Sequence, residues 1–209
     1  NEFFIASDAT PVVEYTKKVV YLEDEEMVVL NRDGNFEILT IQNKEVTPYI
    51  QELELKLEMI EKGGYEHFML KEIHEQPKSI FDSIRGRIDV VNGEVKLGGL
   101  EEYKNRILNA KRFIIVSCGT SWHAGLLAEY IFEDLARVNV EVEYASEFRY
   151  RNPVIDTDDI VIAISQSGET ADTMAAIEMA KQKGCLILGV CNVVGSSIPR
   201  TSHAGCYTH

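Results

Sequence analysis

The sequence predicts an α/β fold: a doubly wound parallel sheet that follows a smaller, β-rich N-terminal part. From Lys111 onward, apolar strand-like runs alternate with helical patterns, as in a parallel sheet with right-handed crossovers. One of these runs, residues 160–164, is continuously apolar, which is typical of a strand buried on both faces. Near the N-terminus, Asp33-Gly34 lies between two β-rich runs and predicts a hairpin.

The N-terminal part is expected to be antiparallel β structure up to about residue 45. Residues 18–23 and 27–30 are rich in β-branched and apolar side chains, and residues 36–41 supply the partner strand of the hairpin. The acidic run at 23–26 is most simply an exposed turn. This part therefore contains short antiparallel strands joined by turns.

The middle of the chain is less regular. Residues 45–62 leave strand and helix open, because apolar residues alternate while the Glu and Lys between them favour helix. Residues 65–75 have a helical pattern, Gln76-Pro77 is expected to end it, and residues 78–85 are expected to form a second short helix. Residues 89–100 are rich in Gly and show no clear period, so we interpret them as a linker.

The C-terminal part contains the alternating elements of the predicted sheet. The candidate strands are residues 112–117, 140–144, 159–164 and 185–191, and the candidate helices are residues 121–137, 145–151 and 170–183.

Two turns in this part are rich in hydroxyl side chains, and each lies between a strand and a helix. The stretch Ser165–Thr170 contains three hydroxyls and an amide but no Lys or Arg, and Ser117–Ser121 precedes another helix. Backbone N–H groups at a helix start are unpaired and attract anions. We therefore predict that the turns bind a phosphate monoester through neutral donors. The alternative is simple helix capping, but one cap needs only one hydroxyl.

The bulk properties exclude several classes of partner. A net charge of −13 argues against binding to nucleic acid or to an anionic membrane surface. No apolar run approaches the length of a membrane span, and residues 1–10 lack the features of a signal peptide. The first residue is Asn1 and the last residues end in no polar tail, so we expect both ends to be interior to a larger protein.

The four cysteines match no zinc-binding spacing and are expected to be mostly buried free thiols, which fits a reducing cytoplasm. They are Cys118, Cys185, Cys191 and Cys206.

Several motifs resemble the glutamine–fructose-6-phosphate aminotransferases, which are also called glucosamine-6-phosphate synthases. Those that resemble the first sugar isomerase (SIS) domain of this family are residues 117–121, 145–151, 165–173 and 191–197. Those that resemble the end of its glutaminase domain and the passage into the isomerase half are residues 4–8, 21–23 and 71–77. The resemblance covers essentially the whole chain.

The resemblance implies a domain organisation. Residues 1–75 would be the C-terminal part of an N-terminal-nucleophile glutaminase domain, and residues 76–105 an interdomain linker. Residues 106–209 would be a flavodoxin-like SIS subdomain, truncated at its C-terminus.

The resemblance also implies an activity. Ammonia released from glutamine aminates fructose 6-phosphate, which is isomerised to glucosamine 6-phosphate, without a metal or organic cofactor. It further implies a cytoplasmic homodimer. The family's nucleophilic cysteine and its acid/base residues have no counterpart within residues 1–209, so we expect this stretch alone to be inactive.

The family's sugar-phosphate contacts map onto six residues of the two turns, of which the first would face the sugar and the others the phosphate. They are Thr120, Ser121, Ser165, Gln166, Ser167 and Thr170.

Four other polar residues near the turns attract attention but favour structural roles. Glu169 could be a general base, but an acid at a helix start also complements the helix dipole, and a carboxylate facing a phosphate would repel it. His123 is expected to be structural or exposed. Arg149 and Arg151 are expected to form inter-subunit or intradomain ion pairs. The remaining histidines lack partners at metal-binding spacing.

Two other functions are alternatives to an aminotransferase. A non-enzymatic SIS domain that senses a sugar phosphate and regulates transcription would carry a basic, helical DNA-binding part at its N-terminus, whereas residues 1–45 are β-rich. A nucleotide-binding doubly wound domain would show G-x-G-x-x-G after its first strand, and Gly119 stands alone there.

Overall fold

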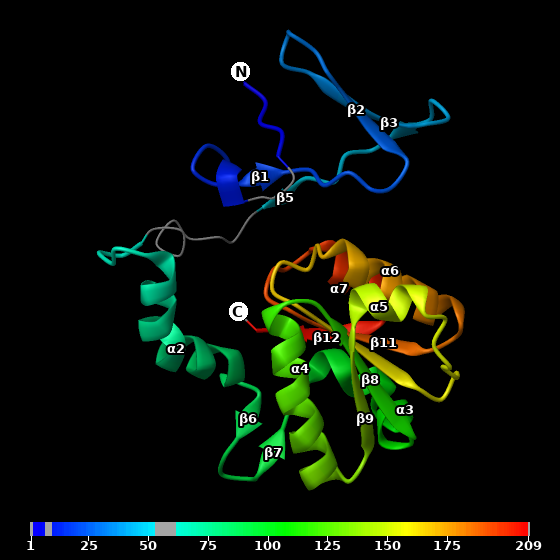
Figure 1. The fold of residues 1–209 in the computed structure, drawn as a ribbon. Helices are drawn as coiled ribbons and strands as arrows, with labels where there is room; N and C mark the ends of the chain where they lie inside the picture. The colour runs from blue at the N-terminus through cyan, green and yellow to red at the C-terminus, as the bar shows by residue number, and fades with distance from the viewer. Residues whose placement is uncertain (1, 7–9, 53–61, 209) are drawn as a thin grey trace. The chain divides into compact units, whose positions relative to one another are not determined.

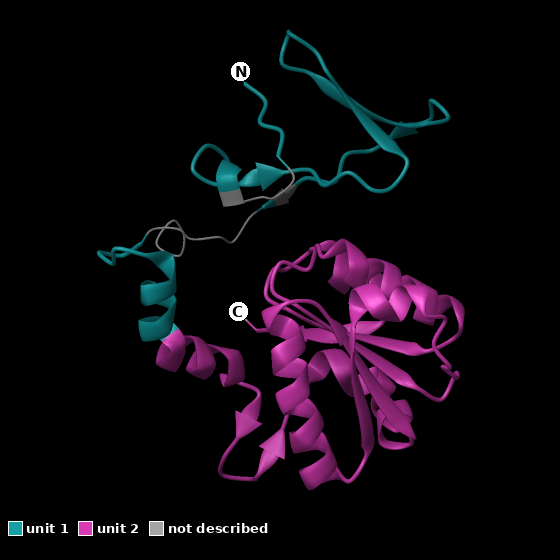
Figure 2. Cartoon of the chain, viewed as in Figure 1, with its two compact units in different colours: residues 1–75 teal, residues 76–209 magenta. Residues whose placement is uncertain are grey.

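The computed structural model describes residues 2–6, 10–52 and 62–208, and the chain divides into two compact units, residues 1–75 and 76–209 (Figure 2). No helix within the described ranges is long and apolar enough to cross a bilayer.

The first unit contains short antiparallel strands. Its elements before the first long helix are η1 (Thr10–Val12), β1 (Lys18–Val19), β2 (Glu26–Leu30), β3 (Phe36–Thr40), β4 (Glu45–Val46) and β5 (Gln51–Glu52). Strands β2, β3 and β4 form one antiparallel sheet, and β1 pairs with β5 (Figure 1). The predicted hairpin is confirmed: Asp33 accepts a hydrogen bond from the Asn35 N–H, and Gly34 has a φ of +90°.

Two predictions in this unit have other outcomes. The strand expected over 18–23 is wrong in length, because only Lys18 and Val19 pair with a partner strand. Part of the ambiguous segment 45–62 contains β4 and β5, whereas residues 53–61 lie outside the described residues.

A single helix, α2 (Phe68–Ile84), replaces the two helices expected around Pro77. The prediction that Gln76-Pro77 ends the helix is wrong. A proline inside a helix removes one backbone hydrogen bond, but good helix formers surround it here. The Lys78 Nζ and Asp82 Oδ2 atoms also form an i,i+4 ion pair of 2.7 Å one residue beyond it.

The second unit contains the rest of α2 and an α/β domain. Its further elements are β6 (Ile88–Asp89), β7 (Glu94–Val95), η2 (Gly98–Tyr103), α3 (Lys104–Leu108), β8 (Arg112–Ser117), α4 (Thr120–Ile131), η3 (Phe132–Ala136), β9 (Asn139–Tyr144), α5 (Ala145–Tyr150), β10 (Ile160–Ser165), α6 (Ala171–Gln182), β11 (Leu186–Cys191), α7 (Ser197–Thr201) and β12 (Ala204–Tyr207).

The predicted parallel sheet is confirmed. It has the order β12-β11-β10-β8-β9, and every neighbouring pair of strands in it is parallel. The four expected strands match β8, β9, β10 and β11 to within one residue at each end. Counted along the chain from β8, this is the 2-1-3-4-5 order of flavodoxin-like folds.

Apolar side chains cover both faces of this sheet. On one face, Ile114, Val116 and Val161 pack beneath α5, α6 and α7, where Phe148 and Ile177 are fully buried. On the other face, side chains of β8, β9, β10 and β11 pack against η2, α3 and α4. Figure 1 shows these two helical layers on opposite sides of the strands. Burial on both faces explains why the strands read as continuous apolar runs.

Two segments of this unit differ from the sequence reading. The helix expected over 121–137 is α-helical only to Ile131 and continues as a π-helical turn to Ala136, after which Arg137 takes a left-handed φ of +53°. Residues 89–100 contain regular structure despite their lack of period, because β6 pairs with β7 and the Asp89 carboxylate accepts hydrogen bonds across the turn between them.

Candidate functional site

The strand order creates a switch point between β8 and β10. The chain leaves β8 toward β9 on one side, and leaves β10 toward β11 on the other side. Ser117 at the end of β8 is paired with Ile164, one residue before the end of β10, so both strands end at the same edge. In doubly wound sheets, ligands bind outside the carboxyl ends of the strands at such a point. The two hydroxyl-rich turns both begin here.

The β8–α4 turn (Cys118–Gly119) leads directly into the first residues of α4. Gly119 has φ +59° and ψ −134°, a conformation that L side chains rarely adopt, and its carbonyl accepts a hydrogen bond from Trp122 N. Thr120 is exposed and Ser121 is half-buried. No side chain caps this helix start. The orphan N–H groups of the first turn therefore keep their capacity to bind an anion.

The β10–α6 turn (Gln166–Thr170) is shaped by its own hydroxyls. Ser165 is buried, and its Oγ accepts a hydrogen bond from Gly168 N at 3.0 Å and lies 3.1 Å from Thr170 Oγ1. Ser167 Oγ accepts a hydrogen bond from Glu169 N at 3.2 Å. Gln166 is exposed, whereas Ser167 and Thr170 are half-buried. In this structure Ser165 thus holds the turn, and the other polar groups lie nearer the surface.

The acidic residues next to this turn are each engaged by a neighbouring element. Glu169 Oε1 accepts a hydrogen bond from Ser197 N at 2.8 Å. The expectation that Glu169 serves as an acid at the start of α6 is wrong, because its carboxylate bonds to the first residue of α7 instead, and Asp172 is the acid in the first turn of α6. In the first turn of α6, Asp172 Oδ1 accepts a hydrogen bond from Arg149 Nη1 at 2.9 Å.

The arginines form intradomain ion pairs, which is one of the two kinds expected. Arg149 pairs with Asp172, and Arg151 pairs with Glu143 on β9. Neither partner lies in the two turns.

His123 is exposed, as expected, and its ring meets the edge of Trp122 with 5.1 Å between centroids. Trp122 stacks on Tyr144 at 4.3 Å, beside the end of β8. Both Trp122 Nε1 and Ser117 Oγ are buried without a hydrogen-bond partner among the described residues.

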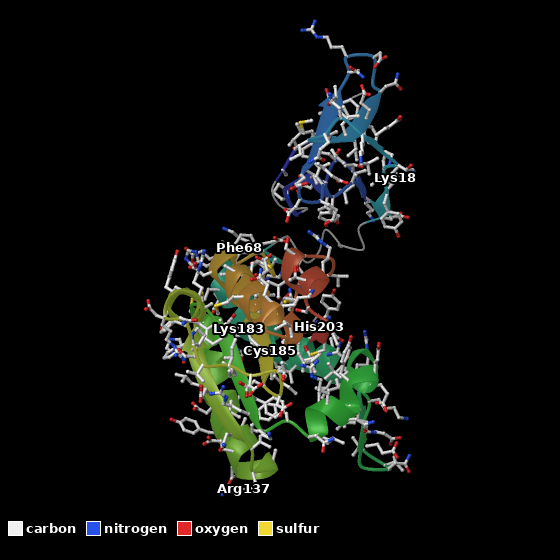
Figure 3. All side chains as sticks on the ribbon, turned by 90° about the vertical axis from the view of Figure 1, so that its right-hand side faces the viewer. Lys18, Phe68, Arg137, Lys183, Cys185 and His203 are labelled. Carbon is white, nitrogen blue, oxygen red and sulfur yellow. The ribbon has the colours of Figure 1, made fainter. Side chains whose placement is uncertain are left out.

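His203 has a structural contact far from the turns. Its Nδ1 accepts a hydrogen bond from Ile187 N near the start of β11, and Figure 3 labels His203 among the side chains of this domain. Burial, with smaller contributions from Lys181 and Arg106, lowers the pKa of His203. No group of three or more His, Cys, Asp or Glu side chains in the described ranges is placed to hold a metal ion.

All four cysteines are free, and two of them, Cys185 and Cys191, are buried. Burial raises the pKa of the Cys191 thiol to about 11. Cys118, in the first turn, is half-buried, and its Sγ lies 4.0 Å from Thr173 Oγ1. The expectation of buried free thiols is therefore confirmed for Cys185 and Cys191, whereas Cys118 and Cys206 are half-buried.

The sequence reading assigned no role to the β11–α7 loop (Asn192–Ser196), which lies against the β10–α6 turn. Asn192 N donates a hydrogen bond to Gln166 O, and Ile198 N donates one to Gly168 O at 2.9 Å. Two signals pointed to this loop: residues 191–197 resemble a motif of the SIS domain, and Gly195-Ser196-Ser197 before a helix is a capping pattern. Its contact with a turn nearly thirty residues earlier has no local signal.

A cavity of about 120 Å³ opens along β11, α7 and β12, and its lining includes Gly189, Pro199 and His203. It contains no residue of either turn. The candidate site is therefore defined by the strand ends and helix starts, not by this cavity.

Comparison with known proteins agrees with this arrangement. The family described as "SIS domain" matches residues 106–209. Residues 106–209 belong to the SIS family. The SIS domain thus contains both turns and the whole parallel sheet.

Curated relatives match the full length of the chain. It is 61% identical over 209 residues to the glutamine–fructose-6-phosphate aminotransferase [isomerizing] of Bacteroides thetaiotaomicron, covering all of this chain and 34% of that protein. It is 46% identical to the protein of the same name from Saccharomyces cerevisiae, covering 99% of this chain and 29% of that protein. The chain therefore spans about a third of the length of the curated relatives it matches.

Solved structures match the SIS domain. The C-terminal domain of glucosamine-fructose-6-phosphate aminotransferase from Francisella tularensis aligns with a TM-score of 0.66 and 39% identity, over 71% of this chain and 42% of that one. The glucosamine-6-phosphate deaminase of Thermotoga maritima aligns with a TM-score of 0.54 at 18% identity, over 68% of this chain and 40% of that one, which shows the fold alone.

Proposed function

We propose that this chain is part of a glutamine–fructose-6-phosphate aminotransferase and that its SIS domain binds the phosphate of fructose 6-phosphate. The main support is the position of the two hydroxyl-rich turns. One precedes α4 and the other precedes α6, and they follow neighbouring strands at the switch point of the sheet. Identity of 61% to a relative of that name supports the same proposal. The whole enzyme would convert glutamine and fructose 6-phosphate to glutamate and glucosamine 6-phosphate.

In this proposal the residues of the two turns bind and orient the substrate without a cationic side chain. The orphan N–H groups at the starts of α4 and α6 and the hydroxyls of Ser121, Ser167 and Thr170 donate to the phosphate oxygens. Ser165 and Gln166 complete the second turn, and Thr120 faces the sugar. Hydrogen bonds to a charged group contribute more than those between neutral groups, so neutral donors suffice to hold a dianion.

The proposed division of labour follows the sequence expectations. Residues 1–75 would be the end of a glutaminase domain, residues 76–105 a linker, and residues 106–209 the first SIS subdomain. We expect residues 1–209 alone to release no glutamate and form no glucosamine 6-phosphate. The enzyme is expected to act in the cytoplasm.

Calorimetric titration of the full-length protein with fructose 6-phosphate and with fructose tests the binding proposal. Fructose 6-phosphate should bind at least tenfold more tightly, because fructose lacks the group that the two turns hold. Equal affinities for the two sugars would refute the proposal. An assay of glutamate and glucosamine 6-phosphate then distinguishes the enzyme from a sugar-phosphate sensor, which would bind without turnover.

We further propose that the full-length protein is a homodimer through its isomerase part. An exposed apolar stripe on the outer side of α4 and η3 supports this proposal, because a second subunit could bury it. It consists of Leu127, Tyr130, Ile131 and Leu135. Light scattering at micromolar concentration should give twice the monomer mass, and a monomer would contradict the proposal.

A further inference from the structure

We propose that Glu169 is a positioning residue for phosphate binding, which acts by fixing the β10–α6 turn to the start of α7. The inference rests on the proposed function, because it assigns a role within the same site. Glu169 would not touch the phosphate or the reacting atoms. Its carboxylate would instead hold the turn in the conformation that presents Ser167 to the ligand.

The turn and the segment after β11 are joined at three places. Glu169 Oε1 accepts a hydrogen bond from Ser197 N at 2.8 Å. Ile198 N donates to Gly168 O at 2.9 Å, and Asn192 N donates to Gln166 O at 3.3 Å. Two of these are bonds between backbone groups, so a substitution at Glu169 leaves their donors and acceptors in place. The Glu169 contact is the only one of the three made by a side chain, so substitution can remove it selectively.

The peptide between Gly168 and Glu169 transmits this anchoring to Ser167. Its carbonyl oxygen accepts the hydrogen bond from Ile198 N, and its N–H donates to Ser167 Oγ at 3.2 Å. Because Ser167 Oγ accepts this bond, the hydroxyl proton points away from the peptide and remains able to donate to an anion. An anchored peptide therefore fixes both the position and the donor direction of the Ser167 hydroxyl.

This role also accounts for a carboxylate beside an anion site. An unengaged Glu169 side chain could approach the phosphate and repel it. Bonded to Ser197 N, the carboxylate is held at the start of α7, where this N–H donor stabilises its charge. The same arrangement leaves it poorly placed to act as a general base.

Two substitutions at Glu169 separate the hydrogen bond from the charge. Both Glu169→Ala and Glu169→Gln remove the negative charge, but only the alanine removes the acceptor for Ser197 N. We expect Glu169→Ala to weaken fructose 6-phosphate binding about five- to twentyfold in the full-length protein, less than the loss of a direct hydrogen bond to the phosphate because Glu169 acts through the turn. Glu169→Gln should stay within about threefold of wild type. Equal affinities of the two variants would overturn the proposal.

The donor side offers a second matched pair. Ser197 is the first residue of α7, and Ser196 before it has φ −68° and ψ 169°, a backbone conformation that suits a residue before proline. Ser197→Pro therefore deletes the N–H at the first helical position, where helices accept proline. Ser197→Ala keeps the N–H and controls for loss of the hydroxyl, which accepts a hydrogen bond from Arg200 Nη2.

Ser197→Pro should weaken fructose 6-phosphate binding as much as Glu169→Ala, and Ser197→Ala should bind within about threefold of wild type. The double variant Glu169→Ala/Ser197→Pro should be no weaker than either single variant, because both remove one bond. If the losses of affinity in the two single variants multiply in the double variant, the proposal is overturned. If Ser197→Pro fails to fold, the comparison of the two Glu169 variants decides alone.

The same titrations separate this inference from the proposed function. Wild type that binds fructose as tightly as fructose 6-phosphate refutes the proposed function, and this inference with it. Wild type that prefers the phosphate, together with Glu169→Ala that binds like Glu169→Gln, refutes only the positioning role. Steady-state kinetics supply a further readout: Glu169→Ala should raise the KM for fructose 6-phosphate while leaving the KM for glutamine unchanged.

Discussion

Gly168 lies so close to Ser196 that a Cβ atom added to the glycine would stand 1.9 Å from Ser196 Oγ and 2.7 Å from Ser196 Cβ. Gly168 also has a φ of +69°, where side chains are strained. The turn before α6 therefore has its shape only with glycine at this position. This close approach lets the β11–α7 loop pack directly on the turn.

Gly168→Ala should lower the free energy of unfolding by about 2–4 kcal/mol, the sum of left-handed strain and a clash that Ser196 cannot avoid by rotation alone. Urea unfolding measures this change. Gly98→Ala is the matched control, because no atom lies within 4 Å of its added Cβ. Adding Ser196→Gly to Gly168→Ala should recover part of the loss, and a double variant no more stable than Gly168→Ala would show that the clash is not the cause.

The buried ion pair at the start of the sheet predicts a dependence of stability on acid. Burial alone would raise the pKa of Asp159, but hydrogen bonds from Arg112 and from Asp156 N lower it overall. A lowered folded-state pKa means that the stabilisation is present above the unfolded-state pKa near 4 and is lost as the pH falls through the folded-state pKa.

Asp159→Asn should therefore lower the free energy of unfolding by about 2–4 kcal/mol at pH 7. This loss is smaller than for a fully buried pair, because the Arg112 side chain is a quarter exposed and still pairs with Glu141 in the variant. The loss should shrink as the pH falls below 4. Asp158→Asn, which breaks an exposed pair with Lys111, is the control and should have no measurable effect. A cost at Asp159 that stays constant from pH 7 to pH 3 would refute the ionic explanation.

Cys191 predicts a loss of stability at high pH. Burial raises its pKa to about 11, above the value near 8.5 of an unfolded cysteine. A raised folded-state pKa gives stability that is complete below the unfolded-state pKa and is lost as the pH rises toward 11. The contribution of this group should amount to about 2–3 kcal/mol across that window.

The matched measurement for Cys191 is the slope of unfolding free energy against pH between pH 9 and pH 10.5, in wild type and in Cys191→Ala. The variant should have a slope shallower by up to about 1.4 kcal/mol per pH unit, the contribution of one proton. Identical slopes would show that Cys191 does not titrate as its burial indicates.

The sequence was sufficient for the sheet because its determinants are local. Strands β8, β10 and β11 lie in the sheet interior, so their apolar runs and the helical patterns between them fix the element order. Pro77 shows the limit of local rules, since one lost hydrogen bond did not outweigh the helix formers around it. The short strand β1 shows the same limit, because the residues after Val19 have β-propensity but no partner strand among the described residues.

The sequence could predict that the two turns lie together, because both follow buried parallel strands, whose carboxyl ends meet at one edge of the sheet. The sequence could not predict which hydroxyl faces inward, because the burial of Ser165 and its bond to Gly168 N depend on the turn conformation. The partner of Glu169 was also beyond the sequence, because Ser197 lies 28 residues away and is reached only through β11. The six substrate-contact assignments stay predictions until ligand binding is measured.

Ser121 and Ser167 provide the decisive test of convergence, because they lie in different turns at the same sheet edge. A hydrogen bond to a charged group contributes roughly 1.5–3 kcal/mol. Ser167→Ala should therefore weaken fructose 6-phosphate binding about ten- to a hundredfold while leaving the weak binding of fructose unchanged. The Ser167→Ala and Ser121→Ala effects should be non-additive, because both hydroxyls are expected to donate to one phosphate group.

Titration of wild type, the two single variants and the double variant gives the coupling between Ser121 and Ser167. Ser202→Ala is a matched control, because Ser202 follows α7, its hydroxyl donates to Ile198 O in that helix, and it lies outside both turns. Two outcomes would refute convergence on one phosphate: normal binding by Ser167→Ala, or single-variant losses that multiply in the double variant as they do for independent sites.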